Sequence, residues 1–555
     1  MYTRQAASKW LKRLSFRSTA FHLTSEAPNL PNVSIFSSRC NVKSSSRKNS
    51  NGYHDGYLNG FPWVFLSGPA AAIILGINSN PVLAEEASFK PSSENGIEDG
   101  ETVGLRKVED GSVVSNLHTS KWRVFTDTAR DLFLQGRLED AEKYFISAIQ
   151  EAKEGFGERD PHVASAFNNL AELYRVMKTF DKAEPMYLEA INILEESYGT
   201  EDIRVGSALH NLGQFYLVQR KLKESCNCYE FFILQIKGRV LGFGHVDYAD
   251  TMYHLGTVLY LLGEEKDSEA LIQDSIRILE EGGLGESILC IRRLRYLAKM
   301  HMKSNNLLEA ENVQRKILHI MELSKGWNSL ETINSADGLA STLYANGCLK
   351  EAQELLERCL DARKSLLPED HIQIAANMLH IARVVMLSSN ELKATDVSKA
   401  VTATDRAREL LNNSIRISRG ILYTISKRGE KKEIHKDGGS GKDGRTALII
   451  LLQSLDSLGN LEITVQEMQV SKKDPLLIEA ENLLTQCFST YQKFKGSTFD
   501  TLEVKAEYCT CLKRLSSLIS SGRTSKQTGR VSLEDLKDEI SRLEVELSPY
   551  RKQKS

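Results

Sequence analysis

A helical unit recurs about every 42 residues along most of this 555-residue chain. Ala183 follows Ala141 by 42 residues, Ser225 follows Ala183 by 42, and Ala352 follows Ala310 by 42. Such a fixed period is typical of a solenoid, in which each unit buries its apolar face by stacking on its neighbours. Because solenoids bind other molecules along a groove, the repeat favours a binding function over a catalytic one.

Each unit is predicted to contain two helices. A first helix is predicted around 163–174, where apolar residues recur with i, i+3, i+4, i+7 spacing. A second helix is predicted from Phe180 to about Ser197, and Gly199 then ends the unit. The 41% content of hydrophobic residues is enough for a large core, and the lack of strand-like alternation argues against sheets. The sequence therefore predicts an all-α protein.

The repeat resembles the tetratricopeptide repeat, in its longer kinesin-light-chain-like form. The resemblance is strong over 121–280, fair over 287–367 and weak from 371 onward. It implies a right-handed superhelical α-solenoid of helix-turn-helix units. No coiled coil of any length accompanies the repeats, so a role in microtubule transport is not implied. The segment 157–164 belongs to the pattern, and the other matching residues are Leu170, Tyr174, Ala183, Glu184, Pro185, Tyr187, Ala190 and Gly199.

Residues 1–60 have the composition of a disordered organelle transit peptide. They contain nine basic and two acidic residues, and the first 24 residues contain no acid. Basic residues alternate with Trp10, Leu11, Leu14 and Phe16, which predicts an amphipathic basic helix. We expect a mitochondrial protein, with the chloroplast as the alternative because transit peptides of the two organelles overlap in composition. A disordered basic tail without a targeting role is the other interpretation.

An uncharged apolar segment occupies residues 61–77 and is interrupted by Gly68-Pro69. Its length is at the lower limit for a membrane span. Three interpretations stay open: an inner-membrane anchor, a cleaved second sorting signal that leads to the intermembrane space or thylakoid lumen, or a buried or disordered apolar patch. Residues 78–118 are predicted to form a flexible acidic linker.

The repeats define the rest of the domain organisation. A solenoid is predicted over 119–420, a basic flexible insertion over 421–444, and degenerate helical repeats with a C-terminal capping helix over 445–549. Within the insertion, 438–444 resembles a phosphate-binding loop, but Lys436 and Asp443 replace the required Gly and Ser/Thr. We therefore expect a solvated loop there, with contact to acidic lipid headgroups or an acidic partner as the alternative.

No residue pattern supports catalysis, a cofactor or a metal site, so the protein is not expected to be an enzyme. The histidines His210, His254 and His380 are spread over different repeats. The nine cysteines include two C-x-C pairs, at 226/228 and 509/511, on predicted helices. Side chains two residues apart on a helix point in different directions, so neither pair is expected to share a metal or a disulfide. We interpret the cysteines as small, buried helix residues.

A protein-interaction scaffold is the predicted function. We expect it to be an assembly or maintenance factor for an organellar membrane complex, associated with the membrane through 61–77. A regulatory subunit of an enzyme complex is the alternative. An RNA-binding helical-repeat protein is a weaker one, because the net charge is −2 and the faces of the first helices are interpreted as neutral to mildly acidic. No nucleic acid partner is therefore expected.

The predicted ligand is a protein or peptide in the concave groove that the first helices line. Aligning Leu170, Leu212 and Leu255 places two columns of polar residues on this face. The resemblance implies that first-helix asparagines hold the backbone of a bound peptide, since an amide both donates and accepts hydrogen bonds. Asparagines that cap or bridge neighbouring helices are the alternative. The columns are Asn169, Asn211 and His254, and Asn168, His210 and Tyr253.

Overall fold

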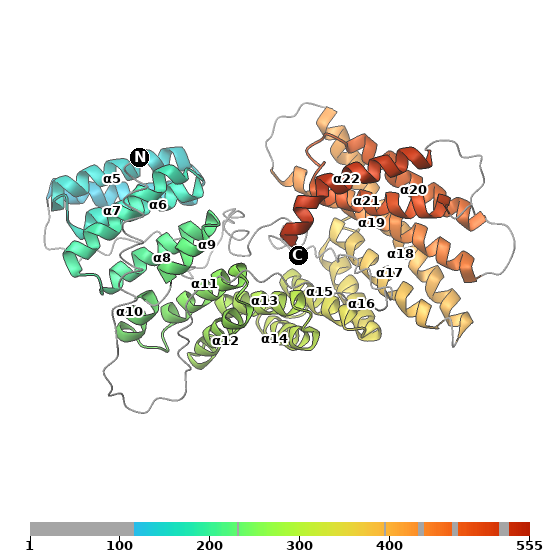
Figure 1. Ribbon diagram of the computed structural model, residues 1–555, viewed down its shortest axis with the longest axis horizontal. Helices are drawn as coiled ribbons and strands as arrows, with labels where there is room; N and C mark the ends of the chain where they lie inside the picture. Colours follow the sequence, from blue (N-terminus) through green and yellow to red (C-terminus); the bar gives the residue numbers. More distant parts are fainter. Residues whose placement is uncertain are drawn as a thin grey trace, which may run out of the picture. The chain divides into compact units, whose positions relative to one another are not determined.

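The computed structural model describes residues 116–229, 232–392, 396–430, 438–468, 475–520 and 532–554. These residues form nineteen helices, with no strand among them (Figure 1). The prediction of an all-α solenoid is therefore confirmed. The predicted transit peptide 1–60, the apolar segment 61–77 and the linker up to 115 lie outside the described residues.

The helices follow one another as pairs, and they belong to two compact units. The N-terminal unit extends to Ile236 and the C-terminal unit begins at Lys237. In the C-terminal third the helices lengthen, up to the 34 residues of α18. The first helices of the pairs are α4 (Leu117–Leu134), α6 (Pro161–Val176), α8 (Ile203–Val218), α11 (Val246–Leu262), α13 (Ile288–Lys303), α15 (Leu330–Ala345), α17 (Ile372–Leu392), α19 (Gly438–Met468) and α21 (Leu502–Ser520). The second helices are α5 (Leu138–Phe156), α7 (Phe180–Tyr198), α9 (Leu222–Tyr229) with α10 (Phe232–Val240), α12 (Glu265–Glu281), α14 (Leu307–Lys325), α16 (Leu349–Leu366), α18 (Val397–Glu430), α20 (Pro475–Phe494) and α22 (Leu533–Lys554).

Capping residues set where the first helices from α6 to α17 begin. From α6 to α15, a side chain just before the helix accepts a hydrogen bond from a backbone N–H two or three residues later, which satisfies a donor that the helix itself leaves unpaired. The same geometry recurs at His371, before α17. The caps are 42 or 43 residues apart, so the repeat persists to the start of α17. They are Asp160, Asp202, His245, Ser287 and Ser329.

A small residue in each second helix lets the two helices of a pair approach closely. The hydroxyls of Ser225 and Ser268 donate to the carbonyl oxygens of Gly213 and Gly256, at 2.8 and 2.6 Å. A larger side chain would hold the helices apart. The 42-residue series of small residues found in the sequence thus forms the buried contact within each pair. Ser268 is the member of the series between Ser225 and Ala310. All members are fully buried: Ala141, Ala183, Ser225, Ser268, Ala310 and Ala352.

The turn after each first helix contains a residue with left-handed backbone geometry. Its φ lies between 58° and 92° in six successive pairs. Three of the six are glycines, which adopt this geometry without strain, whereas the other three have a Cβ that disfavours it. The six are Gly136, Lys178, Arg220, Gly263, Asn305 and Gly347.

Exchanging residue types at this turn position is expected to change stability in opposite directions. Gly263→Ala should lower the free energy of unfolding by about 1 kcal/mol, because it places a Cβ at a φ of 92°. Lys178→Gly should raise it by about 0.5 kcal/mol, since relief of strain is partly offset by the greater freedom of the unfolded chain. Denaturant unfolding of the full chain measures both changes. Shifts of the same sign would contradict the assignment.

The prediction of a flexible insertion over 421–444 is wrong for the residues of that range that the structure describes. Residues 421–430 form the end of α18, and 438–444 form the first turns of α19. The reason is a buried stripe that continues along α18 through Leu411, Ile415 and Leu422. Packing of this apolar face, rather than the charge of the surface residues, keeps the chain helical at least as far as Leu422. The resemblance of 438–444 to a phosphate-binding loop therefore has no structural counterpart.

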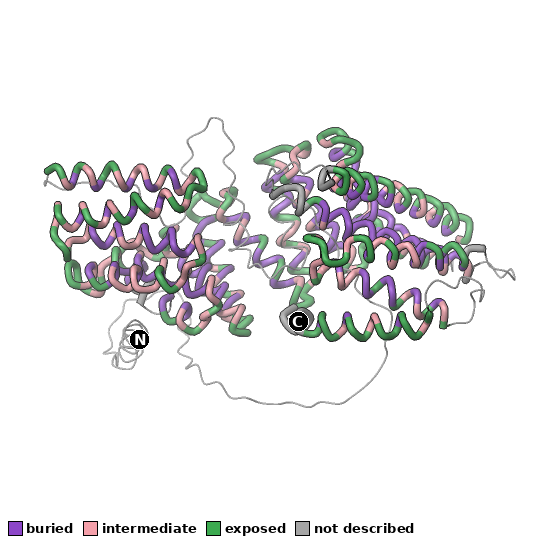
Figure 2. Tube along the Cα trace, turned by 90° about the horizontal axis from the view of Figure 1, so that it is seen from above, coloured by how far each residue is buried: buried purple, intermediate pink, exposed green. Residues whose placement is uncertain are grey.

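The C-terminal unit contains one large core that extends from Leu318 to Leu547. Figure 2 shows the buried residues of this unit along the inner sides of its helices and the exposed residues on the outside. Two described helical segments are long and apolar enough to cross a membrane, Ile372–Leu392 and Asp443–Gln466. Their most apolar windows are 78% and 83% buried within the protein. We therefore interpret both as core helices of this unit.

Candidate peptide-binding face

Neighbouring repeats in the N-terminal unit are joined by a recurring tyrosine–glutamate contact. The Tyr174 hydroxyl donates to Glu142 Oε1 at 2.8 Å, and the Tyr216 hydroxyl donates to Glu184 Oε1 at 3.0 Å. Burial and the nearby Glu142 raise the pKa of Tyr174 to about 12. Each contact joins a second helix to the first helix of the next repeat, so the first helices are held side by side as a layer.

Four of the six predicted groove residues lie in the N-terminal unit. The structure brings Asn168 and Asn211 together: Asn211 Nδ2 donates to Asn168 Oδ1 at 2.9 Å, between α6 and α8. Both are half-buried. Asn169 is 2% exposed, and its Oδ1 has no hydrogen-bond partner among the described residues. His210 is also buried, with its ring edge-on to Tyr229 and its Nε2 accepting from Gln214 at 2.9 Å.

The other two predicted residues, Tyr253 and His254, are buried in the C-terminal unit. Tyr253 packs edge-on against Tyr296 of α13, with ring centroids 5.8 Å apart. Burial lowers the pKa of His254, although Asp250 on the same helix, 3.5 Å away, opposes this shift. The bridging alternative is therefore seen directly for Asn168 and Asn211, whereas a peptide contact by any of the six stays a prediction.

The first helices α11, α13 and α15 lie side by side within the C-terminal unit. Arg293 of α13 is 1% exposed, and its guanidinium donates to Asp250 of α11 at 3.3 Å and to the Ser275 hydroxyl of α12 at 2.7 Å. On the other side, Arg295 donates to the Ser335 hydroxyl of α15 at 3.4 Å. These contacts fix which face of α13 is left to solvent.

That solvent-facing side of α13 is basic. Arg292, Arg295, Lys299 and Lys303 follow one another at i, i+3, i+7 and i+11, which places them on one side of the helix. Arg292 is half-buried and the other three are exposed. The helix contains no acidic residue. We call these four residues the basic face.

Lys299 is the least compensated charge of the basic face. Among the described residues it has no ion pair and no hydrogen bond. Surrounding protein atoms lower its pKa, and the positive charge of Lys303 lowers it further. An anion bound beside Lys299 would oppose both effects, because an opposite charge favours the charged form of an amine. The arrangement thus suits a ligand with several carboxylates or another row of negative charge.

Comparison with known proteins identifies the repeat. Models of the tetratricopeptide repeat match residues 127–196 and 332–373. The chain contains tetratricopeptide repeats. The matched segments lie in different compact units, so repeats of this kind occur in both. None of the curated proteins compared matches the sequence.

Solved structures that match the chain include one of tetratricopeptide-like repeats. The nearly identical repeats of a kinesin light chain from Podosopora anserina share 18% identity, with 37% of this chain and 98% of that chain covered and a TM-score of 0.35. RapI in its apo form shares 12% identity, with 74% and 100% covered and a TM-score of 0.41. A Rap protein complexed with competence and sporulation factor shares 12% identity, with 73% and 98% covered and a TM-score of 0.29.

The basic face was missed by the sequence comparison of tetratricopeptide repeats. The interpretation of all first-helix faces as neutral to mildly acidic is wrong at α13. The predicted columns of groove residues ended with the repeat around Leu255, one repeat before the basic residues. The available signal was the run 288–303, in which four basic residues share one helical side and no acid intervenes.

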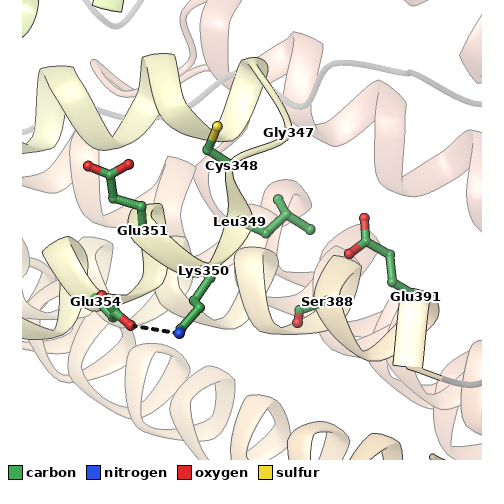
Figure 3. Close-up of a pocket in the computed structure, with 8 residues that line it drawn as sticks. All are labelled: Gly347, Cys348, Leu349, Lys350, Glu351, Glu354, Ser388 and Glu391. Atoms are coloured by element: carbon green, nitrogen blue, oxygen red, sulfur yellow. Dashed lines mark ion pairs between the residues drawn. The ribbon is translucent and has the colours of Figure 1, made fainter. Parts of the chain in front are cut away.

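A second surface feature is a shallow hollow at the turn between α15 and α16 (Figure 3). Its volume is about 460 Å³, and Glu351, Glu354 and Glu391 make it acidic. Lys350 Nζ lies 3.9 Å from Glu354 Oε1, and Arg315 pairs with Glu351 at 2.8 Å. Cys348 is exposed there, but none of the other lining residues is a histidine that could serve as its base. The lining gives no arrangement for nucleophilic catalysis.

Proposed function

We propose that this protein is a protein-interaction scaffold that binds an extended acidic peptide segment of its partner on the basic face of α13. The supporting observation is the row of basic side chains on the exposed side of a first helix, with Lys299 left without a counter-ion. The contacts of Arg293 with α11 and α12 on one side, and of Arg295 with α15 on the other, hold that row in place. Because the helix that carries the row is already ordered, its backbone loses little entropy on binding.

The spacing of the charges favours an extended peptide over a compact anion. Successive members of the basic face are three or four residues apart, about 4.5–6 Å along the axis. Alternate side chains of an extended chain project about every 7 Å on the same side. Acidic residues at such intervals would meet several of the four cations, whereas a single phosphate would meet one or two.

Charge reversal on the basic face tests this function. In a titration of the full chain against a fluorescent peptide of alternating Glu and Ser, Arg295→Glu with Lys299→Glu should weaken binding at least tenfold. Loss of two exposed charge contacts costs about 1.4 kcal/mol in total, which corresponds to that factor. Binding to the unchanged protein should also weaken as salt is added.

Two controls accompany the titration. Lys350→Glu changes a lysine with a 93% exposed side chain on the second helix α16 and should leave binding unchanged. A peptide with Gln in place of Glu should not bind. Equal losses for Lys350→Glu and for the double variant would mean that only net charge matters, and would refute a site on α13.

We also propose that the scaffold acts in an organelle, as an assembly or maintenance factor for a membrane complex. The support comes from the acid-free, basic first 24 residues and the apolar segment 61–77. A reporter fused to residues 1–60 should enter mitochondria, with chloroplasts as the alternative, and residues 119–555 alone should remain in the cytosol. A full-length protein that stays cytosolic would refute this proposal without affecting the peptide site.

A further inference from the structure

Two buried cysteines from different helices face each other in the C-terminal unit. Cys487 of α20 and Cys511 of α21 have their Sγ atoms 2.6 Å apart. Both are 0% exposed. This separation is well inside the contact distance of two unbonded sulfur atoms, and it approaches the length of a disulfide bond, about 2.05 Å.

The packing around the pair fixes its register. Tyr491 of α20 stacks on Tyr508 of α21, with ring centroids 3.9 Å apart and planes 15° from parallel. Tyr491 lies one turn after Cys487 and Tyr508 one turn before Cys511, so the helices are antiparallel and the two contacts are adjacent. Both thiols also approach the Leu452 carbonyl oxygen of α19, at 3.8 and 3.5 Å. The sulfur atoms are thus held together from three helices.

We propose that Cys487 and Cys511 form a disulfide that links α20 to α21. The neighbouring thiol of Cys509 lies two residues from Cys511 and belongs to a different side of α21, so it does not take part. The proposed bond is therefore not a disulfide between Cys509 and Cys511, whose two side chains point apart.

A low-molecular-weight disulfide such as glutathione disulfide can oxidise this pair by thiol–disulfide exchange. One cysteine thiolate attacks the glutathione disulfide and releases one glutathione thiolate. The second cysteine thiolate then attacks the mixed disulfide and releases the other glutathione. Two S–H bonds are lost, one protein S–S bond is formed, and the two electrons reduce glutathione disulfide to two thiols. Burial raises the pKa of the Cys511 thiol, and Cys487 adds to this shift, so reaction should await local opening of α21.

Non-reducing peptide mapping by mass spectrometry tests the link in the full chain. The protein is incubated with glutathione disulfide, natively and in denaturant below the unfolding midpoint, which opens the helices transiently. A tryptic peptide 474–493 joined to peptide 506–513 is expected. Because peptide 506–513 contains both Cys509 and Cys511, the variants assign the bond: Cys509→Ala should keep the linked peptide, and Cys511→Ala and Cys487→Ala should lose it.

Thermal unfolding provides a second measurement that does not depend on peptide recovery. The bond would close a loop between positions 24 residues apart, and the oxidised chain should melt roughly 5 °C above the reduced chain. Cys509→Ala should keep this difference, whereas Cys487→Ala should abolish it. Absence of the linked peptide under both conditions, a link through Cys509, or a melting difference that persists in Cys487→Ala would overturn the proposal.

Discussion

Asp337→Ala is expected to lower the free energy of unfolding of the C-terminal unit by about 3–5 kcal/mol, because it leaves a buried arginine without its counter-ion. Arg363 of α16 is 1% exposed. Its Nη1 lies 3.2 Å from Asp337 Oδ1 and 2.9 Å from Asn377 Oδ1, and its Nη2 pairs closely with Asp337 Oδ2. Although burial by itself lowers the pKa of Arg363, the Asp337 carboxylate raises it above its ordinary value.

Denaturant unfolding monitored by circular dichroism measures this loss. Asp361→Ala removes an exposed acidic residue from the same helix, α16, and should change stability by less than about 0.5 kcal/mol. A double change, Asp337→Ala with Arg363→Met, should be less damaging than Asp337→Ala alone, since no unpaired charge is left in the core. An equal loss of stability in Asp337→Ala and Asp361→Ala would show that the buried ion pair does not stabilise this unit.

Glu172→Ala is expected to cause a loss of similar size, about 3–5 kcal/mol, in the N-terminal unit. Glu172 and Arg175 of α6 are 1% and 4% exposed. Arg175 Nε and Nη2 both lie 2.9 Å from Glu172 Oε2, and the Tyr187 hydroxyl of α7 donates to Oε1. Removing the carboxylate takes away an acceptor that the guanidinium and the phenol share in the core.

Thermal and denaturant melts of the full chain test this effect, with the exposed Glu139→Ala as the matched control. The same cluster predicts a pH effect. Burial, with a further contribution from Glu172, raises the pKa of Tyr187 well above 10 in the folded protein. Its contribution to stability is therefore complete below about pH 10 and decreases as the pH rises above that value. Equal unfolding midpoints for Glu172→Ala and Glu139→Ala would show that the buried pair does not contribute to stability.

The solenoid could be predicted because its repeat is built from local contacts. A capping residue, a left-handed turn and one small buried residue recur in each pair, and each depends on residues only a few positions apart or on the adjacent helix. Ala183 and Ser225 show this directly: the sequence frame that contains them became the buried contact between paired helices. The 42-residue period was therefore sufficient to place the helices up to α16.

The failures have the opposite origin, since they depend on packing between distant segments. Leu422 is buried in the core of the C-terminal unit, so α18 continues through residues that a charge count assigns to a loop. Cys487 meets Cys511 only because α20 and α21 are antiparallel, and no sequence spacing indicates that contact. The burial of Asn169 is likewise not indicated by its place in the first-helix pattern, and its contact with a peptide stays a prediction. The basic face, in contrast, was visible in the sequence as a periodic row.

Lysine footprinting tests most directly the central claim, that an acidic peptide occupies the basic face. The full chain is acetylated with limiting reagent, with and without the Glu-Ser peptide, and modification of each lysine is measured by mass spectrometry. We expect the peptide to protect Lys299 and Lys303 strongly, and to leave Lys316 of α14 and Lys350 of α16 unchanged. Equal protection of all four lysines, or protection confined to Lys316 and Lys350, would contradict a peptide site on α13.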